Sequence, residues 1–454
     1  MIFASNSNKF KYKPNPPQVL ALGFVAMILI GSVLLSLSAA FTGGESLRYL
    51  DALFMAASAV CVTGLSVINP GTHLSTFGQI VLIVLVQIGG LGFMSMTTFA
   101  ALVLRKRISF SERLILQEAI NYSSNDGLIR LIRKVILYAL AIEAAGAFML
   151  ALYLMNEMPL GQAVYFGVFH SISIFNNAGF DLFGVFPGRA SSLIPYVDDP
   201  FVNIVSILLI FFGGIGFTVI SELLTYPQTK KLSLNSKVVL YVSGLLIVVG
   251  TVVIFIMEFT NPLTLQPLSP TGKIFGALFQ SVSSRSAGVN TLDPSTLRQS
   301  TQFFIILLMF IGAAPGSTGG GIKVTTFAVL VGAMVAMLRG RQDIVMFRSR
   351  IPEKTVYHAV TFTIIAFVVV VGAAMALSIT ERAPFLTILF EATSAFGTTG
   401  MSLGITPNLT PVGKILLIFL MFLGRLGPVT FAFALNGRKD KQPYRYPEGK
   451  ITLG

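Results

Sequence analysis

A short stretch that begins with Phe and ends just beyond a Gly decides the fold, because it occurs four times. The first copy, residues 54–65, reads FMAASAVCVTGL. The others are FHSISIFNNAGF at 169–180, FQSVSSRSAGV at 279–289 and FEATSAFGTTGM at 390–401. Each has Ser four residues after the Phe, and its Gly follows Thr or Ala and precedes an apolar residue. Such self-similarity predicts four structural units of one design.

A second glycine motif follows each copy at a similar distance. It reads QIGGLGF at 87–93, FGGIGF at 212–217, FIGAA at 310–314 and FLGRLGP at 422–428. Its first Gly lies 25, 34, 24 and 24 residues after the Gly of the copy. Four units that enter a membrane with one orientation predict a pseudo-fourfold arrangement around a central axis.

The composition is that of a membrane protein. Charged residues make up 11% and hydrophobic residues 54% of the chain, with a mean hydropathy of +0.79, whereas soluble domains carry about 25% charged residues. Spanning segments are expected at 19–39, 76–102, 130–155, 200–224, 238–258, 301–338, 355–379 and 411–435. Between the two spanning segments of each consecutive pair lies an apolar stretch of roughly 12 to 15 residues, which is least clear in the second pair. Such stretches are too short to cross a membrane and predict re-entrant helices. The expected fold class is an all-α membrane protein with four tandem helix–re-entrant pore loop–helix repeats around a pseudo-fourfold pore.

The basic residues predict the orientation of the chain. Of 32 Lys and Arg, 23 fall in the five segments 9–13, 105–134, 230–237, 339–354 and 438–450. The positive-inside rule assigns such segments to the cytoplasm, so every re-entrant stretch should enter from outside. We divide the chain into a cytoplasmic N-terminus (1–18), repeat 1 (19–102), repeat 2 (130–224), repeat 3 with a broken gating helix (238–338), repeat 4 (355–435) and a cytoplasmic C-terminal tail (436–454).

Several function classes are not expected. The net charge of +13 is spread between apolar segments rather than clustered on one soluble face, which argues against nucleic-acid binding. Cys61 is the one cysteine, so no disulfide can form within the chain. The histidines His73, His170 and His358 are far apart and lack metal-ligand spacing. With no visible metal or nucleophile constellation, we expect no enzyme activity and no cofactor in this chain.

The Gly at the apex of each copy suits a cation filter. Rings of backbone carbonyls replace the hydration shell of the ion in potassium channels, and Gly adopts the required backbone angles at little steric cost. The C-terminal dipoles of the re-entrant helices would add a negative potential. The predicted filter binds a cation at backbone oxygens of Val62, Thr63, Gly64, Asn177, Ala178, Gly179, Ser286, Ala287, Gly288, Thr398, Thr399 and Gly400. In the alternative interpretation these Gly only permit tight turns or helix packing.

The sixth apolar segment is interrupted by GAAPGSTGGGIK at 312–323. Pro and repeated Gly destabilise a helix by about 3 and 1 kcal/mol each, and irregular backbone at membrane depth should line a cavity. A phosphate-binding loop is the alternative, but Gly321-Ile-Lys323-Val breaks its Gly-Lys-Ser/Thr spacing. We predict a gate consisting of Gly312, Ala313, Ala314, Pro315, Gly316, Ser317, Thr318, Gly319, Gly320, Gly321, Lys323 and, from the eighth segment, Arg425.

Arg425 occupies the position of Gly90 and Gly214 in the helix motif. A charge within the membrane is costly and indicates function. We expect Arg425 to face the cavity, contact carbonyls of the interrupted stretch and add an electrostatic barrier; the alternative is that it snorkels to the inner surface. Among other charges, Glu391 and Arg285 either pair or brace the filter, and Glu143 has either a coupling role or, as we favour, a partner inside the bundle.

The four repeats resemble those of the Trk/Ktr/HKT superfamily of potassium transporters, specifically the KtrB-type membrane subunit. The resemblance covers about residues 15–438 and rests on VTGL at 62–65, NNAGF at 176–180, SRSAGVN at 284–290 and FGTTGM at 396–401. It implies eight transmembrane helices, one filter glycine per repeat and an intramembrane loop that obstructs the pore. It also implies a homodimer in the bacterial plasma membrane and a cytosolic ring of nucleotide-binding KtrA-type subunits.

The resemblance also bears on the transported ion. Some plant relatives carry Ser at the first filter position and favour sodium, whereas this chain has Gly64, which favours potassium. The expected function is therefore K+ uptake across the plasma membrane, in contact with the lipid bilayer. A sodium-preferring member or a symporter with Na+ as coupling or activating ion remains the alternative.

Overall fold

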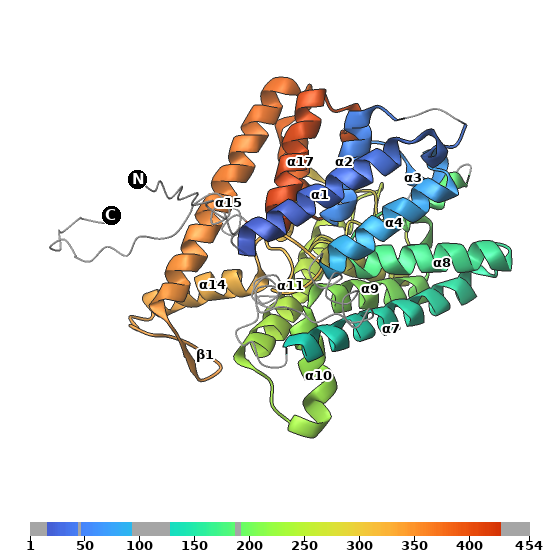
Figure 1. The fold of residues 1–454 in the computed structure, drawn as a ribbon. Helices are drawn as coiled ribbons and strands as arrows, with labels where there is room; N and C mark the ends of the chain where they lie inside the picture. Colours follow the sequence, from blue (N-terminus) through green and yellow to red (C-terminus); the bar gives the residue numbers. More distant parts are fainter. Residues whose placement is uncertain (1–15, 44–46, 93–127, 187–191, 428–454) are drawn as a thin grey trace, which may run out of the picture.

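The computed structural model describes residues 16–43, 47–92, 128–186 and 192–427. The described chain is almost entirely helical (Figure 1). Its longer helices are α1 (Pro16–Ser36), α2 (Tyr49–Val60), α4 (Thr76–Leu91), α7 (Leu128–Leu154), α8 (Leu160–Phe175), α9 (Pro200–Gly214), α10 (Phe217–Thr229), α11 (Leu234–Glu258), α12 (Pro270–Ser283), α13 (Gln299–Phe310), α14 (Val324–Leu338), α15 (Glu353–Thr380), α16 (Phe385–Gly397) and α17 (Pro411–Leu426). Short elements are α3 (Pro70–His73) and the 3₁₀ turns Ser38–Ala40, Phe183–Val185, Ile194–Tyr196, Pro294–Thr296 and Thr406–Asn408.

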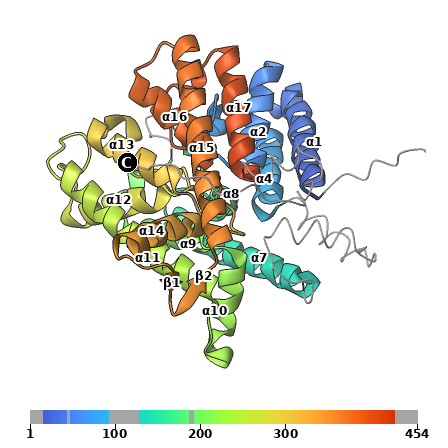
Figure 2. The same ribbon diagram turned by 90° about the vertical axis from the view of Figure 1, so that its left-hand side faces the viewer.

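These helices form four units of one design around a common centre, as predicted (Figure 2). Each unit consists of a long first helix (α1, α7, α11, α15), a short pore helix (α2, α8, α12, α16) and a second helix (α4, α9, α13, α17). Pore helices of 12 to 16 residues reach about 1.5 Å per residue, which is too short to cross about 30 Å of hydrocarbon. They therefore end inside the bundle, where the pore loops begin.

The units are joined in a ring by one recurring contact. The second helix of each unit packs against the pore helix of the next, in the pairs α4 with α8, α9 with α12, α13 with α16 and α17 with α2. The last pair joins the fourth unit to the first, so the ring is closed. This order of contacts is what a pseudo-fourfold axis requires.

Three of the four second helices begin with the same local chemistry. The side chains of Ser75, Asp199 and Thr410 accept hydrogen bonds from the backbone N–H three residues later, at Gly78, Val202 and Gly413. Such caps satisfy one of the backbone donors that a helix start leaves free. These caps help to fix where α4, α9 and α17 start, whereas α13 begins after Arg298 without a side-chain cap.

The first helix of each unit is long and apolar enough to span a membrane. Four described segments are long and apolar enough to cross a membrane, namely Pro17–Ser36, Ile132–Leu154, Leu234–Glu258 and Glu353–Thr380. The pair α9 and α10 passes the same test together but is bent by 104°. The predicted continuous segment 200–224 is therefore wrong, because Gly216 with φ +90° interrupts the helix.

The last Gly of the helix motif also has a positive φ in the first and fourth units. Gly92 and Gly427 have φ of +84° and +83° and follow the last residues of α4 and α17. The rest of the predicted segments 76–102 and 411–435 lies outside the described residues, as do the tail at 436–454 and most of 1–18. In the third unit the break predicted around Pro315 separates α13 from α14.

One small sheet departs from the all-helical prediction. Strands β1 (Ile344–Met346) and β2 (Ser349–Ile351) form an antiparallel hairpin between α14 and α15. It lies within the segment 339–354, which the sequence distinguished only by its basic residues. The hairpin packs against α14 at the end of the bundle away from the pore loops (Figure 1).

Candidate pore and gate

The four apex glycines lie next to one another in a closed ring. Gly64, Gly179, Gly288 and Gly400 have φ of +92°, +73°, +71° and +86°. A Cβ added to each would meet the carbonyl oxygen that precedes the glycine of the neighbouring unit: Gly64 meets Ala178, Gly179 meets Ala287, Gly288 meets Thr399 and Gly400 meets Thr63. Any larger residue would both strain the backbone and push two units apart.

A second left-handed residue precedes each apex by two positions. Val62, Asn177, Ser286 and Thr398 have φ of +56°, +59°, +86° and +48°. Such angles cost non-glycine residues about 1–3 kcal/mol each and persist where the surroundings impose them. The same two positions are left-handed in all four loops, so the loops share one backbone design despite their different sequences.

The Ser of each copy braces its loop, a role that sequence reasoning did not assign. The N–H before the apex Gly donates to the carbonyl of this Ser, from Thr63 to Ser58 at 2.8 Å and from Thr399 to Ser394 at 2.9 Å. In the third loop Ala287 reaches Ser283 at 3.0 Å over one residue fewer. The hydroxyl adds a second bond in three copies: Ser58 Oγ accepts from the Gly64 N–H at 3.0 Å, and the hydroxyls of Ser173 and Ser283 donate to the carbonyls of Phe180 and Val289. The recurrence of Ser at this position was the signal that could have revealed these hydroxyl bonds.

The interrupted stretch between α13 and α14 contacts the pore loops of three units. The side-chain amide of Asn177 donates to Thr318 Oγ1 at 3.0 Å, and the N–H of Gly320 donates to Thr398 Oγ1 at 2.8 Å. A Cβ added at Gly319 would meet the Ser286 Cβ at 2.8 Å. Asn177, Ser286 and Thr398 are the left-handed residues of their loops, so the predicted gate lies directly against the predicted filter.

The same stretch is anchored to the bend in the second unit. The N–H of Ala314 donates to the Gly214 carbonyl at 3.0 Å, and that of Phe217 donates to the Gly316 carbonyl at 2.9 Å. The hydroxyl of Thr318 donates to the Gly213 carbonyl at 3.1 Å. The bend at Gly216 thus exposes backbone groups that bind the interrupted stretch, which gives the unpredicted break a structural role.

Arg425 links the interrupted stretch to the first unit. Its guanidinium donates to the carbonyl of Thr318 and to the carbonyls of Gly89 and Gly90 at 2.5 and 3.0 Å. The side chain therefore stays within the bundle and does not snorkel to the surface. Lys323 also turns inward, and its amine donates to the Gly319 carbonyl at 2.7 Å. Two cationic side chains thus bind carbonyls of one loop.

Glu143 has partners inside the bundle, as we favoured. Its carboxylate accepts hydrogen bonds from the side chains of Gln87 at 2.9 Å and Asn176 at 3.0 Å, and Asn176 also donates to Gln87 at 2.8 Å. Asn176 immediately precedes the pore-loop residue Asn177. The buried carboxylate therefore fixes the position of the second pore loop.

The alternative in which Glu391 pairs with Arg285 is wrong. Glu391 accepts hydrogen bonds from Ser402 at 3.1 Å and from Thr406, whereas Arg285 donates to the carbonyl and hydroxyl of Ser243, each at 3.2 Å. Hydroxyl and carbonyl groups within each side chain's own unit are nearer than the opposite charge. Both residues brace the unit to which they belong.

Residues 3–440 match the protein family described as TrkH, cation transport protein. The chain belongs to the TrkH family. This membership makes it a multi-pass membrane transporter and not an enzyme. The TrkH-family chain is 42% identical over 439 residues to the Ktr system potassium uptake protein B of Bacillus subtilis, with 97% of each chain covered. It is 38% identical to the potassium/sodium uptake protein NtpJ of Enterococcus hirae, again with 97% of each covered.

A solved structure agrees with the architecture of this TrkH-family chain. The potassium transporter TrkH from Vibrio parahaemolyticus superimposes with a TM-score of 0.70 over 94% of this chain and 86% of that one, at 20% identity. At that identity the likeness supports the fold alone. The family match and the Ktr relative, rather than this structure, confirm the resemblance to the Trk/Ktr/HKT superfamily that the repeats indicated.

Proposed function

We propose that the protein takes up K+ across the bacterial plasma membrane through the ring of apex glycines. The observation that carries this proposal is the cyclic order of close approaches, in which each apex glycine abuts the carbonyl before the next. A ring of carbonyls around one axis is the coordination that replaces the hydration shell of K+. The filter then comprises the backbone oxygens of Val62, Thr63, Gly64, Asn177, Ala178, Gly179, Ser286, Ala287, Gly288, Thr398, Thr399 and Gly400.

The electrostatics of the loops favour a cation. All four pore helices end at the ring, and the C-terminus of a helix carries the equivalent of about half a negative charge. The side-chain oxygens Thr63 Oγ1, Asn177 Oδ1 and Thr399 Oγ1 are buried without a hydrogen-bond partner among the described residues. The ring is therefore rich in acceptors, while the guanidinium of Arg425 is committed to carbonyls outside it.

The interrupted stretch acts as the gate in this proposal, together with Arg425. Its contacts with Asn177 and Thr398 close the space next to the filter, and two cationic side chains raise the electrostatic barrier there. Opening requires these hydrogen bonds to break. K+ then moves down its electrochemical gradient.

We further propose that the protein is a homodimer whose cytoplasmic side docks a ring of KtrA-type nucleotide-binding subunits. The Bacillus subtilis relative is named as protein B of a Ktr system, which supports partnership with other Ktr components. Both termini and the basic segments would then be cytoplasmic. No cofactor is required in this chain, because carbonyl coordination alone replaces the hydration of the transported ion.

A second candidate function is transport or coupling of Na+. The Enterococcus hirae relative is named a potassium/sodium uptake protein. Sodium preference would require a smaller or more polar ring than four glycines provide. We therefore rank K+ uptake first and use a substitution at Gly288, the third apex glycine, to distinguish it from Na+ transport.

The decisive experiment replaces Gly288 with Ser in the full chain and measures K+ and Na+ uptake in proteoliposomes. A side chain here abuts the Thr399 carbonyl, so we expect K+ uptake to fall by at least about tenfold and its preference over Na+ to narrow, since a shift of 1.4 kcal/mol is tenfold. Gly372→Ser is the matched control, because space at Gly372 is open. Unaltered uptake of both ions in Gly288→Ser would refute the filter assignment.

A further inference from the structure

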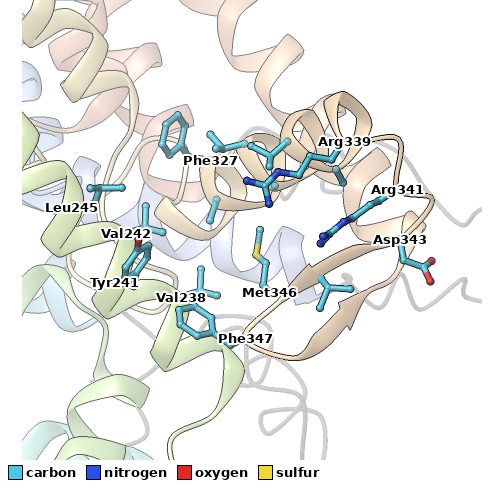
Figure 3. Close-up of a pocket in the computed structure, with 16 residues that line it drawn as sticks. Val238, Tyr241, Val242, Leu245, Phe327, Arg339, Arg341, Asp343, Met346 and Phe347 are labelled. Atoms are coloured by element: carbon cyan, nitrogen blue, oxygen red, sulfur yellow. The ribbon is translucent and has the colours of Figure 1, made fainter.

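A pocket of about 440 Å³ lies away from the pore, between α11, α14 and the β1–β2 hairpin (Figure 3). Helix α11 contributes Val238, Val242 and Leu245, and the hairpin contributes Met346 and Phe347. The volume lies within the range of small-molecule sites, about 300–1,000 Å³. The lining is apolar along most of its length, so the pocket suits a hydrocarbon group.

The hairpin holds the pocket open by contacts at both ends. The Phe347 ring meets the Tyr241 ring of α11 edge-on, with centroids 5.9 Å apart. At the other side Gly332 of α14 leaves the space that the Met346 methyl group occupies. The turn residues Phe347 and Arg348 have φ of +47° and +63°, angles that bulky residues rarely adopt. The hairpin is thus fixed across the gap between two helices.

Positive charge is concentrated at one end of this pocket. Figure 3 shows the guanidinium groups of Arg339 and Arg341 directed toward the pocket and the Asp343 carboxylate directed away from it. Asp343 is paired with Arg350 at 2.8 Å. Neither Arg339 nor Arg341 has a side-chain hydrogen bond or ion pair with another described residue. Within the described residues, two cations without an opposite charge therefore border an apolar pocket.

We propose that this pocket binds one anionic phospholipid, with an acyl chain along α11 and α14 and the phosphate on Arg339 and Arg341. Large apolar side chains near the pocket are exposed: Tyr241 is 62% and Met337 is 83% exposed. Aromatic and basic residues gather where a membrane meets water. A peptide would leave backbone groups unsatisfied against such a lining. A lipid requires polar partners only at its headgroup, where the arginines are.

The test is native mass spectrometry of the full chain in detergent, titrated with phosphatidylglycerol or phosphatidylcholine. We expect one phosphatidylglycerol to bind in preference. The double variant Arg339→Gln/Arg341→Gln should lower its affinity by about 25-fold, since each basic side chain contributes about fivefold to anionic-lipid binding. Lys230→Gln/Lys231→Gln removes the same charge from exposed residues that do not line the pocket, and should leave the bound lipid in place.

A third variant tests the apolar part without altering charge. Val242→Trp fills the pocket and should abolish the bound phosphatidylglycerol, while thermal unfolding in detergent verifies that the chain is folded. Equal loss in both double variants, or equal binding of the two lipids, would mean general surface attraction and would overturn the site. If the pocket variants instead shift the protein from dimer to monomer with the bound lipid unaltered, the pocket is a self-association surface and the proposal fails.

Discussion

The third unit differs from the other three at the end of its second helix. In units one, two and four the first glycine of the second helix abuts a carbonyl at the end of that unit's pore helix, Gly89 at Val60, Gly213 at Phe175 and Gly424 at Phe396. In unit three Gly312 abuts the carbonyl of Gly320 instead. The pore loops nevertheless keep one backbone design. In the proposed function, the four similar loops form the filter and the one unit that departs from the rest supplies the gate.

The largest effect is expected from a substitution that disrupts the contact between second helix and pore helix in unit one, two or four. Gly213→Val places a side chain on the Phe175 carbonyl and on Thr318. Because backbone at the end of a pore helix cannot yield, we expect a loss of about 3 kcal/mol or more in unfolding free energy. Folded yield and thermal unfolding in detergent measure it. Gly312→Val, which presses on a loop, should lose less stability and alter uptake more.

Gly244→Val is the matched control for both changes. Gly244 lies in α11 with open space around its Cα, so the control should unfold near the temperature of the parent protein. If Gly213→Val were as stable as Gly244→Val, the close packing of second helix and pore helix would not support the ring.

Arg425→Ala tests how the interrupted stretch of unit three, the proposed gate, affects K+ uptake. It removes hydrogen bonds to Thr318, Gly89 and Gly90. Hydrogen bonds to charged groups contribute about 1.5–3 kcal/mol, so we expect K+ uptake to rise by about tenfold or more. Uptake kinetics in proteoliposomes measure it. Arg382→Ala, at an exposed arginine, is the control, and an Arg425→Ala protein with parental rate and KM would rule out the barrier.

The smallest effect is expected from Thr318→Val, which keeps the shape of the side chain. It removes the bond from Asn177 at 3.0 Å and that to Gly213 at 3.1 Å. At about 0.5 kcal/mol for each of the two neutral hydrogen bonds, the low end of their usual contribution, uptake should rise by about fivefold. Thr363→Val, whose hydroxyl bonds only within α15, should not alter it. A decrease in uptake would mean that Thr318 supports the open state.

Much of this architecture was predictable because its signals are repeated. Four copies of one motif predicted the units, and a run of Pro and Gly around Pro315 predicted the break between α13 and α14. The bend at Gly216 was missed, because a glycine in an apolar run looks the same in the sequence whether it packs closely, as Gly213 does, or breaks a helix. The hairpin was missed because its turn residues, Phe347 and Arg348, are not those that tight turns favour.

The site was predictable at the level of position and less so at the level of contacts. The apex glycines and Arg425 stood out because repetition or charge marked them. The partners of Glu391 and Arg285 could not be read from the sequence, because hydroxyls and carbonyls compete with opposite charges for a buried ionic group. The backbone carbonyls that Arg425 reaches carry no mark in the sequence.

The closure of the ring has a consequence for how the chain is made. Arg425 binds Gly89 and Gly90 across 336 and 335 positions of sequence, and Lys414 pairs with Asp51 across 363. During synthesis the face of α2 that packs on α17 therefore has no partner from this chain until α17 is made, although α1 and α4 already cover its other faces. Assembly of the four-unit ring is completed by its last helix, so a chain truncated before α17 leaves the ring open between the first and fourth units.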